Sequence, residues 1–244
     1  MRIIVCLCLA SLLTLLTACQ EVVLENVARD LGLQGIALNQ GGALDDATIV
    51  RGLKEALAVG TDRAVRVVGQ ADGYYGNRMI KVLMPEKMRT VADLLGKVGF
   101  QRQVDEFELS MNRAAERAAP VAAEYFVGAI REMTFADARQ ILQGGETAAT
   151  DFFRGKTAAR IHTAFRPTVT KSLDDVGATR AYKNMMATYA ALPLAGRTNF
   201  DLDQYVTTKA VDGLFLMLGE EERKIRANPA ARTTELLRRV FSRQ

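Results

Sequence analysis

The side chains that could do chemistry in this chain are few, and most of them are carboxylates. The only histidine, His162 in "RIHTAF", has no second ligand at a metal-binding spacing. The sequence also lacks the Gly-x-Ser-x-Gly motif that would supply the serine of a Ser–His–Asp site. We therefore interpret it as a structural residue of a helix. Since no glycine-rich stretch follows the Rossmann or Walker pattern, the sequence indicates no cofactor and no metal site.

Once metal, Ser–His–Asp and nucleotide-binding sites are excluded, carboxylate chemistry is the remaining catalytic possibility. A single glutamate whose pKa is raised by a pocket can act as a general acid on a glycan. Glu108 lies among apolar residues, but the run Glu220 to Glu222 precedes the basic residues 223–226, as on an exposed helix with i,i+4 pairs. The sequence thus favours a non-catalytic protein, with a glycan-cleaving envelope hydrolase that uses one buried carboxylate as the alternative.

The strongest local motif is Leu16-Thr17-Ala18-Cys19, at the end of an uncharged apolar run. It resembles the bacterial lipobox, in which the cysteine thiol receives a diacylglycerol and the chain is cut before it. The run is too short for a typical spanning helix and slightly long for a signal peptide, so ordinary secretion and a retained anchor are the alternatives. We predict a lipoprotein signal peptide over residues 1–18 and lipidation at Cys19.

Lipidation also accounts for the cysteine content. Cys6 and Cys8 would leave with the signal peptide, so the mature chain would hold no thiol, which suits an oxidising compartment. Two or three acyl chains, palmitate among them, would anchor the protein stably to a membrane. Gln20, where an aspartate commonly retains lipoproteins in the inner membrane, favours the outer membrane with the protein facing the periplasm.

The rest of the chain divides into a tether and one helical domain. Residues 19–44 are glycine-rich and read as the lipidated N-terminus and tether, and residues 45–244 read as the domain. The net charge is only +4 and contains no block of like charges, so no nucleic-acid partner is expected.

Apolar residues recur with a period near 3.6 through most of the domain, which predicts an all-α fold, an irregular bundle of about eight to ten helices. Pro120 predicts a break and Thr134 a capping box. Met79–Leu83 is the one segment that could instead form a β-strand. The expected helices cover residues 45–68, 85–95, 101–133 with the break, 134–142, 146–165, 167–176, 179–192, 202–226 and 229–241.

Four motifs resemble the bacterial family known as domain of unknown function 4197. They are "ELSMNRAAE" (108–116), "ILQGGETAATDFF" (141–153), "YVTTKAVDGLFLML" (205–218) and "NPAARTTELLRRVF" (228–241). The resemblance covers about residues 44–241. It implies a mainly helical, exported or lipid-anchored protein and carries over no catalytic or binding residue.

The matching motifs contain polar residues that form our candidate cluster. Three of them, Asn112, Arg113 and Glu116, span about one helical turn and are expected to lie together. Hydrogen bonding between helices, or capping, is the alternative role for such residues. The full candidate set is Ser110, Asn112, Arg113, Glu116, Arg232, Thr233 and Thr234.

The expected function is a cell-envelope lipoprotein whose helical domain binds or scaffolds a partner, namely a protein, a lipid or a peptidoglycan fragment. An apolar binding groove would need adaptable side chains. The chain offers methionine and aromatic residues that serve either this role or the core: Phe152, Phe153, Met185, Met186 and Tyr189.

Overall fold

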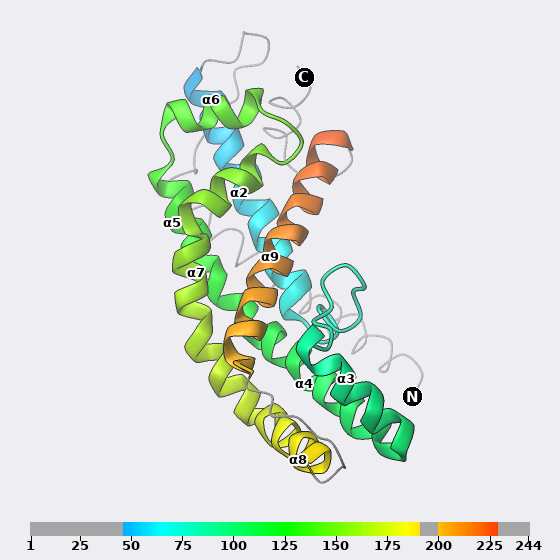
Figure 1. The fold of residues 1–244 in the computed structure, drawn as a ribbon. Coiled ribbons are helices and arrows are strands. Elements are labelled where there is room, and N and C mark those ends of the chain that lie inside the picture. The colour runs from blue at the N-terminus through cyan, green and yellow to red at the C-terminus, as the bar shows by residue number, and fades with distance from the viewer. Residues whose placement is uncertain (1–45, 191–199, 229–244) are drawn as a thin grey trace, which may run out of the picture.

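The computed structural model describes residues 46–190 and 200–228, and this part of the chain is built from helices without a strand (Figure 1). The all-α prediction is confirmed. The elements are α2 (Asp46–Gly69), α3 (Glu86–Leu95), the π-helical turn η1 (Gly96–Phe100), α4 (Gln101–Ala118), the 3₁₀ turn η2 (Ala119–Val121), α5 (Ala122–Glu132), α6 (Phe135–Gln143), α7 (Ala148–Asp175), α8 (Ala178–Ala190) and α9 (Leu202–Ala227).

The expected eight to ten helices are too many for the described residues. There, α3, η1, α4, η2 and α5 follow one another with no loop between them, so the described chain makes six continuous helical segments. No helix of this part has the length and apolar character needed to cross a membrane. The predicted signal peptide, Cys19, the tether and the helix over residues 229–241 lie outside the described residues.

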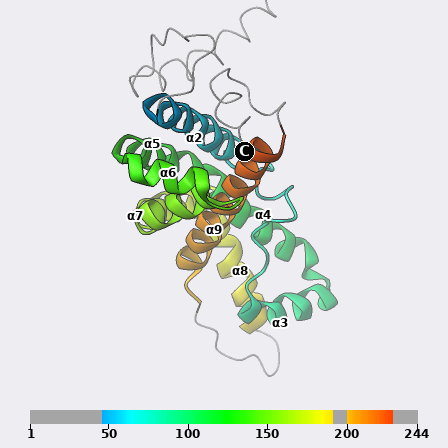
Figure 2. The ribbon, with the colours of Figure 1, turned by 90° about the horizontal axis from the view of Figure 1, so that it is seen from above.

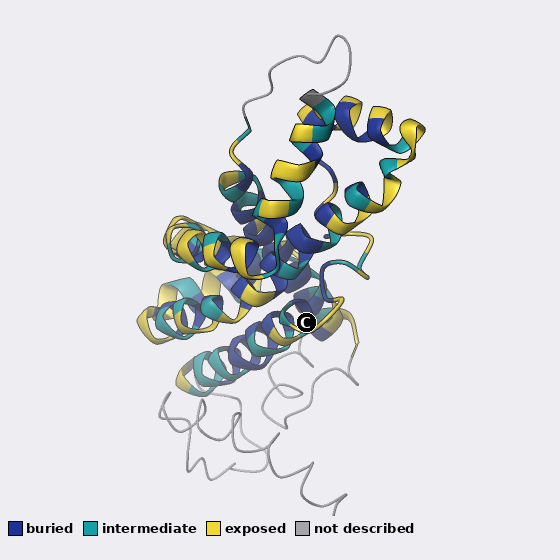
Figure 3. Cartoon of the chain, turned by 90° about the horizontal axis from the view of Figure 1, so that it is seen from below, coloured by how far each residue is buried: buried dark blue, intermediate teal, exposed yellow. Residues whose placement is uncertain are grey.

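The centre of the fold is the pair α7 and α9, which run side by side through the molecule (Figure 1). Helices α2 and α5 pack on this pair. Helix α4 contacts both α7 and α9, and it also packs against α3 and α8 (Figure 2). The buried residues face one another across these contacts, and the exposed residues point outward (Figure 3).

Three fully buried aromatic rings join α5, α7 and α9. The ring of Phe126 meets Phe153 and Phe215 edge-on, at centroid distances of 5.4 Å and 5.9 Å. Edge-to-face contact suits the ring quadrupoles, and truncating a buried phenylalanine typically costs about 3–5 kcal/mol. The core therefore fixes the relative positions of these three helices.

Several helix ends agree with the sequence. Pro120 lies in η2, which separates α4 from α5. The predicted capping box at the start of α6 is present, with the Thr134 side chain accepting from the N–H of Asp137 and the Asp137 carboxylate accepting from the N–H of Thr134. Helix α9 begins after Asp201, whose side chain accepts from the N–H of Gln204.

The predicted break at Pro167 is wrong. Helix α7 continues through this proline, so the two helices expected over 146–165 and 167–176 are one. Proline removes one hydrogen bond of the helix, but the ring is exposed while Ile161, Phe165 and Val169 form a continuous buried stripe on the other side. Packing of that stripe outweighs the local cost.

Candidate functional site

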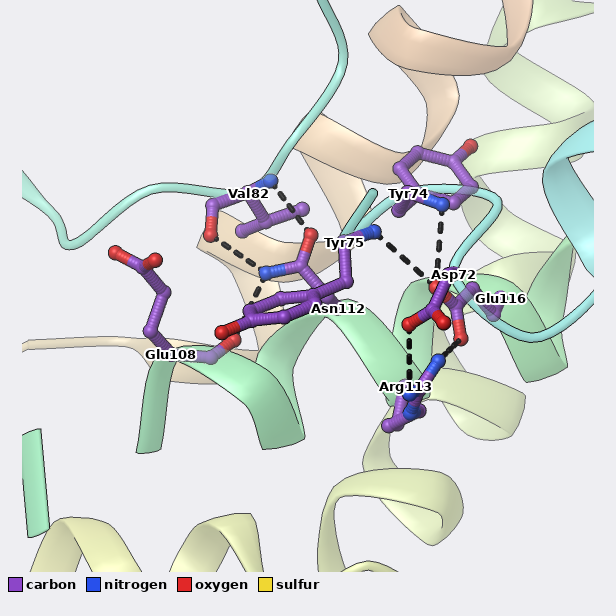
Figure 4. A network of polar contacts seen from close by, with 8 residues as sticks. All are labelled: Asp72, Tyr74, Tyr75, Val82, Glu108, Asn112, Arg113 and Glu116. Atoms are coloured by element: carbon purple, nitrogen blue, oxygen red, sulfur yellow. Dashed lines mark hydrogen bonds and ion pairs between the residues drawn. The ribbon is translucent and has the colours of Figure 1, made fainter. Parts of the chain in front are cut away.

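Helix α4 carries a polar face that points into the protein instead of into solvent. Asn112 and Glu116 are buried and lie four residues apart, so their side chains leave the same face of the helix. Both reach the irregular segment 70–85 that connects α2 to α3 (Figure 4). Because this segment has no regular structure, its backbone groups need partners from side chains.

Asn112 supplies such partners to Val82. Its Oδ1 accepts from the N–H of Val82 at 2.8 Å, and its Nδ2 donates to the carbonyl of Val82 at 2.8 Å. The same Nδ2 also donates to the carbonyl of Glu108 at 2.8 Å, inside α4. The amide therefore pairs with Val82 as a neighbouring strand would, and it holds the extended segment at Met79–Leu83 without a strand in the described residues.

Glu116 holds the turn that precedes this stretch. Its Oε1 accepts from two consecutive backbone groups, the N–H of Tyr74 at 3.1 Å and that of Tyr75 at 3.2 Å. Its Oε2 accepts from Arg113 at 2.7 Å, and the other end of that guanidinium donates to Asp72 at 2.8 Å. The hydrogen bond to Glu116 is the main cause that raises the pKa of Arg113.

The turn also contacts α9. Tyr74 is fully buried, and its hydroxyl donates to the carbonyl of Ala210 at 2.6 Å. Gly213, one turn further along α9, lies so close that an added Cβ would be 2.7 Å from the Tyr74 ring and 3.1 Å from Ile80. Glycine is thus required at this position for the segment to reach the helix.

The structure brings together three of the predicted cluster residues, Asn112, Arg113 and Glu116, around segment 70–85. Ser110 is buried elsewhere on α4, where its hydroxyl donates to the carbonyl of Phe107. Arg232, Thr233, Thr234 and Cys19 lie outside the described residues. Asn112 and Glu116 bind backbone groups of the segment, and Arg113 binds the Glu116 and Asp72 carboxylates, so the three residues build the local structure and leave the outer side of the segment open.

That outer side borders an open groove of about 400 Å³ between segment 79–89 and α9. The volume lies within the range of small-molecule sites. Six large apolar side chains are exposed in the described residues, and three of them line this groove: Met79 (61%), Leu83 (53%) and Leu216 (38%). An apolar concentration of this kind on one surface is typical of a binding site.

Several charged side chains also line the groove. Lys81 pairs with Glu108 at 2.7 Å, and that hydrogen bond raises the pKa of Lys81. Asp212 lies 3.5 Å from Arg154. Among the described residues, Arg89 forms no ion pair.

Tyr205 lies between the two walls of the groove. Its hydroxyl donates to the carbonyl of Leu83 at 3.0 Å, and Lys209 lies over its ring at 5.8 Å. Partial burial raises the pKa of Tyr205, while the positive charge of Arg89 opposes that rise. Tyr205 thus joins α9 to segment 79–89 and lies near two cations, Lys209 and Arg89.

A second buried carboxylate lies on α9, away from the groove. Glu222 accepts from the N–H groups of Ala149 and Thr150 and from the Thr150 hydroxyl, at 2.8–2.9 Å, and from Arg226 at 2.9 Å. It therefore caps the start of α7. The expectation that residues 220–222 form an exposed face is wrong for Glu221 and Glu222, which are buried because α9 packs against α7 and α2 here.

The other candidate residues serve the core. His162 is half-buried between α7 and α9, 3.3 Å from the Thr208 hydroxyl, in the structural role expected of it. In the described residues no group of three or more histidine, cysteine or acidic side chains could hold a metal ion. Phe153 and Met185 are buried in the core, so the groove is lined by a different set of residues.

The groove residues were missed by sequence reasoning, although one signal was present. In the stretch 79–84 the buried residues Ile80, Val82 and Met84 alternate with the exposed Met79 and Leu83. An extended segment that packs one face inside is expected to carry polar residues on the other. Here apolar residues lie on both faces of the segment. One face packs on the core of the protein, and the exposed apolar face indicates that something outside the chain binds there.

Fold and site together define an all-helical domain with a preformed groove. Residues 43–242 match the family described as "Protein of unknown function (DUF4197)", and the chain belongs to this family. No curated protein and no solved structure matches the chain.

Proposed function

We propose that this protein is a lipid-anchored protein of the cell envelope whose helical domain is a non-catalytic binding module, with the groove between segment 79–89 and α9 as its binding site. The anchor rests on Cys19 and the apolar run before it. The observation that carries the binding role is the groove itself, where exposed apolar side chains stand on a segment fixed from behind by Asn112 and Glu116.

The fixed segment supports binding because a preformed site loses little entropy when a ligand enters. Segment 70–85 is joined to two helices by side-chain hydrogen bonds, from α4 through Glu116 and from α9 through Tyr205. The exposed Met79 and Leu83 are therefore presented in a constant position.

The buried carboxylates give less support to the hydrolase alternative. Glu116 and Glu222 each accept several hydrogen bonds from backbone and arginine donors. A general acid needs a raised pKa and an open position toward its substrate. Donors within the chain occupy both oxygens of each carboxylate, which suits a structural role.

The binding role is tested with a neutral apolar probe, N-phenyl-1-naphthylamine, whose fluorescence rises in an apolar site. We expect saturable binding to the full chain carrying Cys19→Ala, so that no acyl anchor competes. Leu216→Gln should weaken it about three- to tenfold, since it replaces apolar contact area in the groove. Leu94→Gln is the matched control, because Leu94 is equally exposed (37%) but lies outside the groove.

Equal loss in the two leucine variants, or no saturable binding at all, would contradict the groove as the site. Circular dichroism of each variant checks that the helices are intact.

The anchor is tested separately, by metabolic labelling with a fatty acid and membrane fractionation. We expect the wild-type chain to carry the label and to sediment with the outer membrane. Cys19→Ala should lose the label and leave the membrane fraction, whereas the paired change Cys6→Ala and Cys8→Ala should keep both. Continued labelling of Cys19→Ala would refute lipidation at this residue.

A further inference from the structure

Two cations, Arg89 and Lys209, lie beside Tyr205 in the groove, and binding of a purely apolar ligand does not account for them. Arg89 lies on α3 and Lys209 on α9, so they come from opposite walls. Within the described ranges, Lys209 contacts the ring of Tyr205 and neither residue has an ion-pair partner. Positive side chains of this kind keep affinity for an anion, since no carboxylate of the described residues is in direct contact with them.

The acidic residues of the groove are placed differently. Asp212 and Glu86 also line the groove, but Asp212 lies 3.5 Å from Arg154 on α7, and Glu86 is in the first turn of α3, where a negative charge favours the helix dipole. Both therefore have a favourable positive environment of their own. Within the described residues, Arg89 and Lys209 are the two groove cations that form no ion pair, and both lie near Tyr205.

The groove thus has two chemical parts next to each other. One is apolar, made by Met79, Leu83 and Leu216, and the other is cationic, made by Arg89 and Lys209. A ligand that satisfies both parts carries an acidic group next to an apolar body. A neutral apolar molecule would leave the cations unused, and a small inorganic anion would leave the apolar side chains in water.

We infer that the groove binds an anionic amphiphile, a lipid-like molecule whose acidic head group lies between Arg89 and Lys209 and whose apolar part covers Met79, Leu83 and Leu216. This inference rests on the proposed function, because it names the ligand class of the same groove. The Tyr205 hydroxyl, whose proton is donated to Leu83, keeps its oxygen lone pairs available as a further polar contact.

The test compares two probes that share one ring system and differ in one charge. N-phenyl-1-naphthylamine is neutral, and 1-anilinonaphthalene-8-sulfonate carries a sulfonate. Both are titrated into the full chain carrying Cys19→Ala. We expect the double variant Arg89→Gln/Lys209→Gln to weaken binding of the sulfonate probe about five- to tenfold, as the loss of two partly exposed charge contacts would, and that of the neutral probe less than twofold.

The matched control is Lys87→Gln/Lys97→Gln. It removes the same charge from exposed positions of α3 and η1 that do not line the groove, so both probes should bind it like the unmutated chain. Higher salt should weaken the sulfonate probe in the unmutated chain and have little effect in the Arg89/Lys209 variant. Dodecyl phosphate, below its micelle concentration, should displace the probe, and dodecyltrimethylammonium should not.

The outcomes separate the two proposals. If both probes bind and the Arg89/Lys209 variant affects them equally, the groove is a binding site but the inference of an anionic ligand is wrong. If neither probe binds, both proposals fail. If analytical ultracentrifugation shows a dimer that Leu216→Gln dissociates, a second copy of the chain covers the groove and the amphiphile is overturned.

Discussion

Glu116 on α4 and Glu222 on α9 are both buried carboxylates that accept hydrogen bonds from two consecutive backbone N–H groups and from one nearby arginine. Glu222 binds the first turn of α7, where the N–H groups have no partner within the helix and the helix dipole favours a negative charge. Glu116 binds a turn in segment 70–85, next to Asp72, whose φ of 64° is in the left-handed region.

The same arrangement therefore serves two purposes. At Glu222 it completes a packed junction of α2, α7 and α9, where Glu222, Ala149 and Thr150 are buried. At Glu116 it holds an irregular segment whose opposite side borders the open groove. We expect loss of Glu222 to affect stability alone, and loss of Glu116 to affect both stability and binding.

The largest effect is expected from Glu222→Ala. The change removes acceptors from Ala149, Thr150 and Arg226 together. Breaking a buried charged pair typically costs about 3–5 kcal/mol, so urea unfolding should show a loss of that size. Glu220→Ala, which removes a partly exposed pair with Arg223 on the same helix, should cost less than about 1 kcal/mol. Similar losses in the two variants would contradict the capping role.

Glu116→Gln should lower the free energy of unfolding by less than Glu222→Ala does, but it should also affect binding in the groove. The amide keeps one acceptor for the turn and loses the charge that binds Arg113, so we expect a loss of about 2 kcal/mol. Binding of N-phenyl-1-naphthylamine should weaken as well, because the segment that carries Met79 and Leu83 becomes less ordered. Glu106→Gln, an exposed change on α4, is the control. Unchanged probe binding in Glu116→Gln would break the link between this network and the groove.

Tyr74→Phe should have a smaller effect that depends on pH. Burial raises the pKa of Tyr74, so the folded state keeps the proton at a pH where the unfolded chain loses it. The resulting stability is complete below about pH 10, the unfolded value, and is lost as the pH rises above it. At pH 7 the variant should lose about 1–2 kcal/mol with the hydrogen bond to Ala210.

Urea unfolding of both proteins between pH 7 and pH 11 measures this dependence. The difference between wild type and Tyr74→Phe should shrink above pH 10, because only the wild-type protein must keep this phenol protonated. A constant difference over the whole range would show that Tyr74 does not titrate on unfolding.

The smallest effect is expected from Thr134→Ala at the exposed capping box of α6, which contrasts with the buried cap at Glu222. A lost N-cap side chain typically costs about 1 kcal/mol. The hydrogen bond from the Thr134 side chain is the main cause that lowers the pKa of Asp137, so its contribution is present above about pH 4 and disappears as the pH falls through the lowered value. Unfolding curves at pH 7 and pH 3 should therefore differ for wild type more than for the variant.

The sequence predicted local features well where the cause is local. The capping box at Thr134, the break at Pro120 and the start of α9 after Asp201 each depend on residues within one turn. It also placed Asn112, Arg113 and Glu116 together, since residues three and four apart share a helix face. Their partners in segment 70–85 lie about thirty to forty positions away in the chain, and helical periodicity carries no information on such pairs.

The failures have the same explanation. Pro167 breaks a helix by local rules, and tertiary packing of Phe165 and Val169 kept α7 continuous. Glu222 follows the pattern of an exposed helix face, and the arrival of the α7 N-terminus made it a buried cap.

The amino-acid sequence by itself determined the helical class, most helix ends and the family, because periodicity and capping are properties of neighbouring residues. The tertiary structure alone decided which polar residues are buried and where a groove forms. Met79, Arg89 and Leu216 belong to three separate parts of the chain, and only the approach of segment 79–89 to α9, at Gly213, makes them one surface.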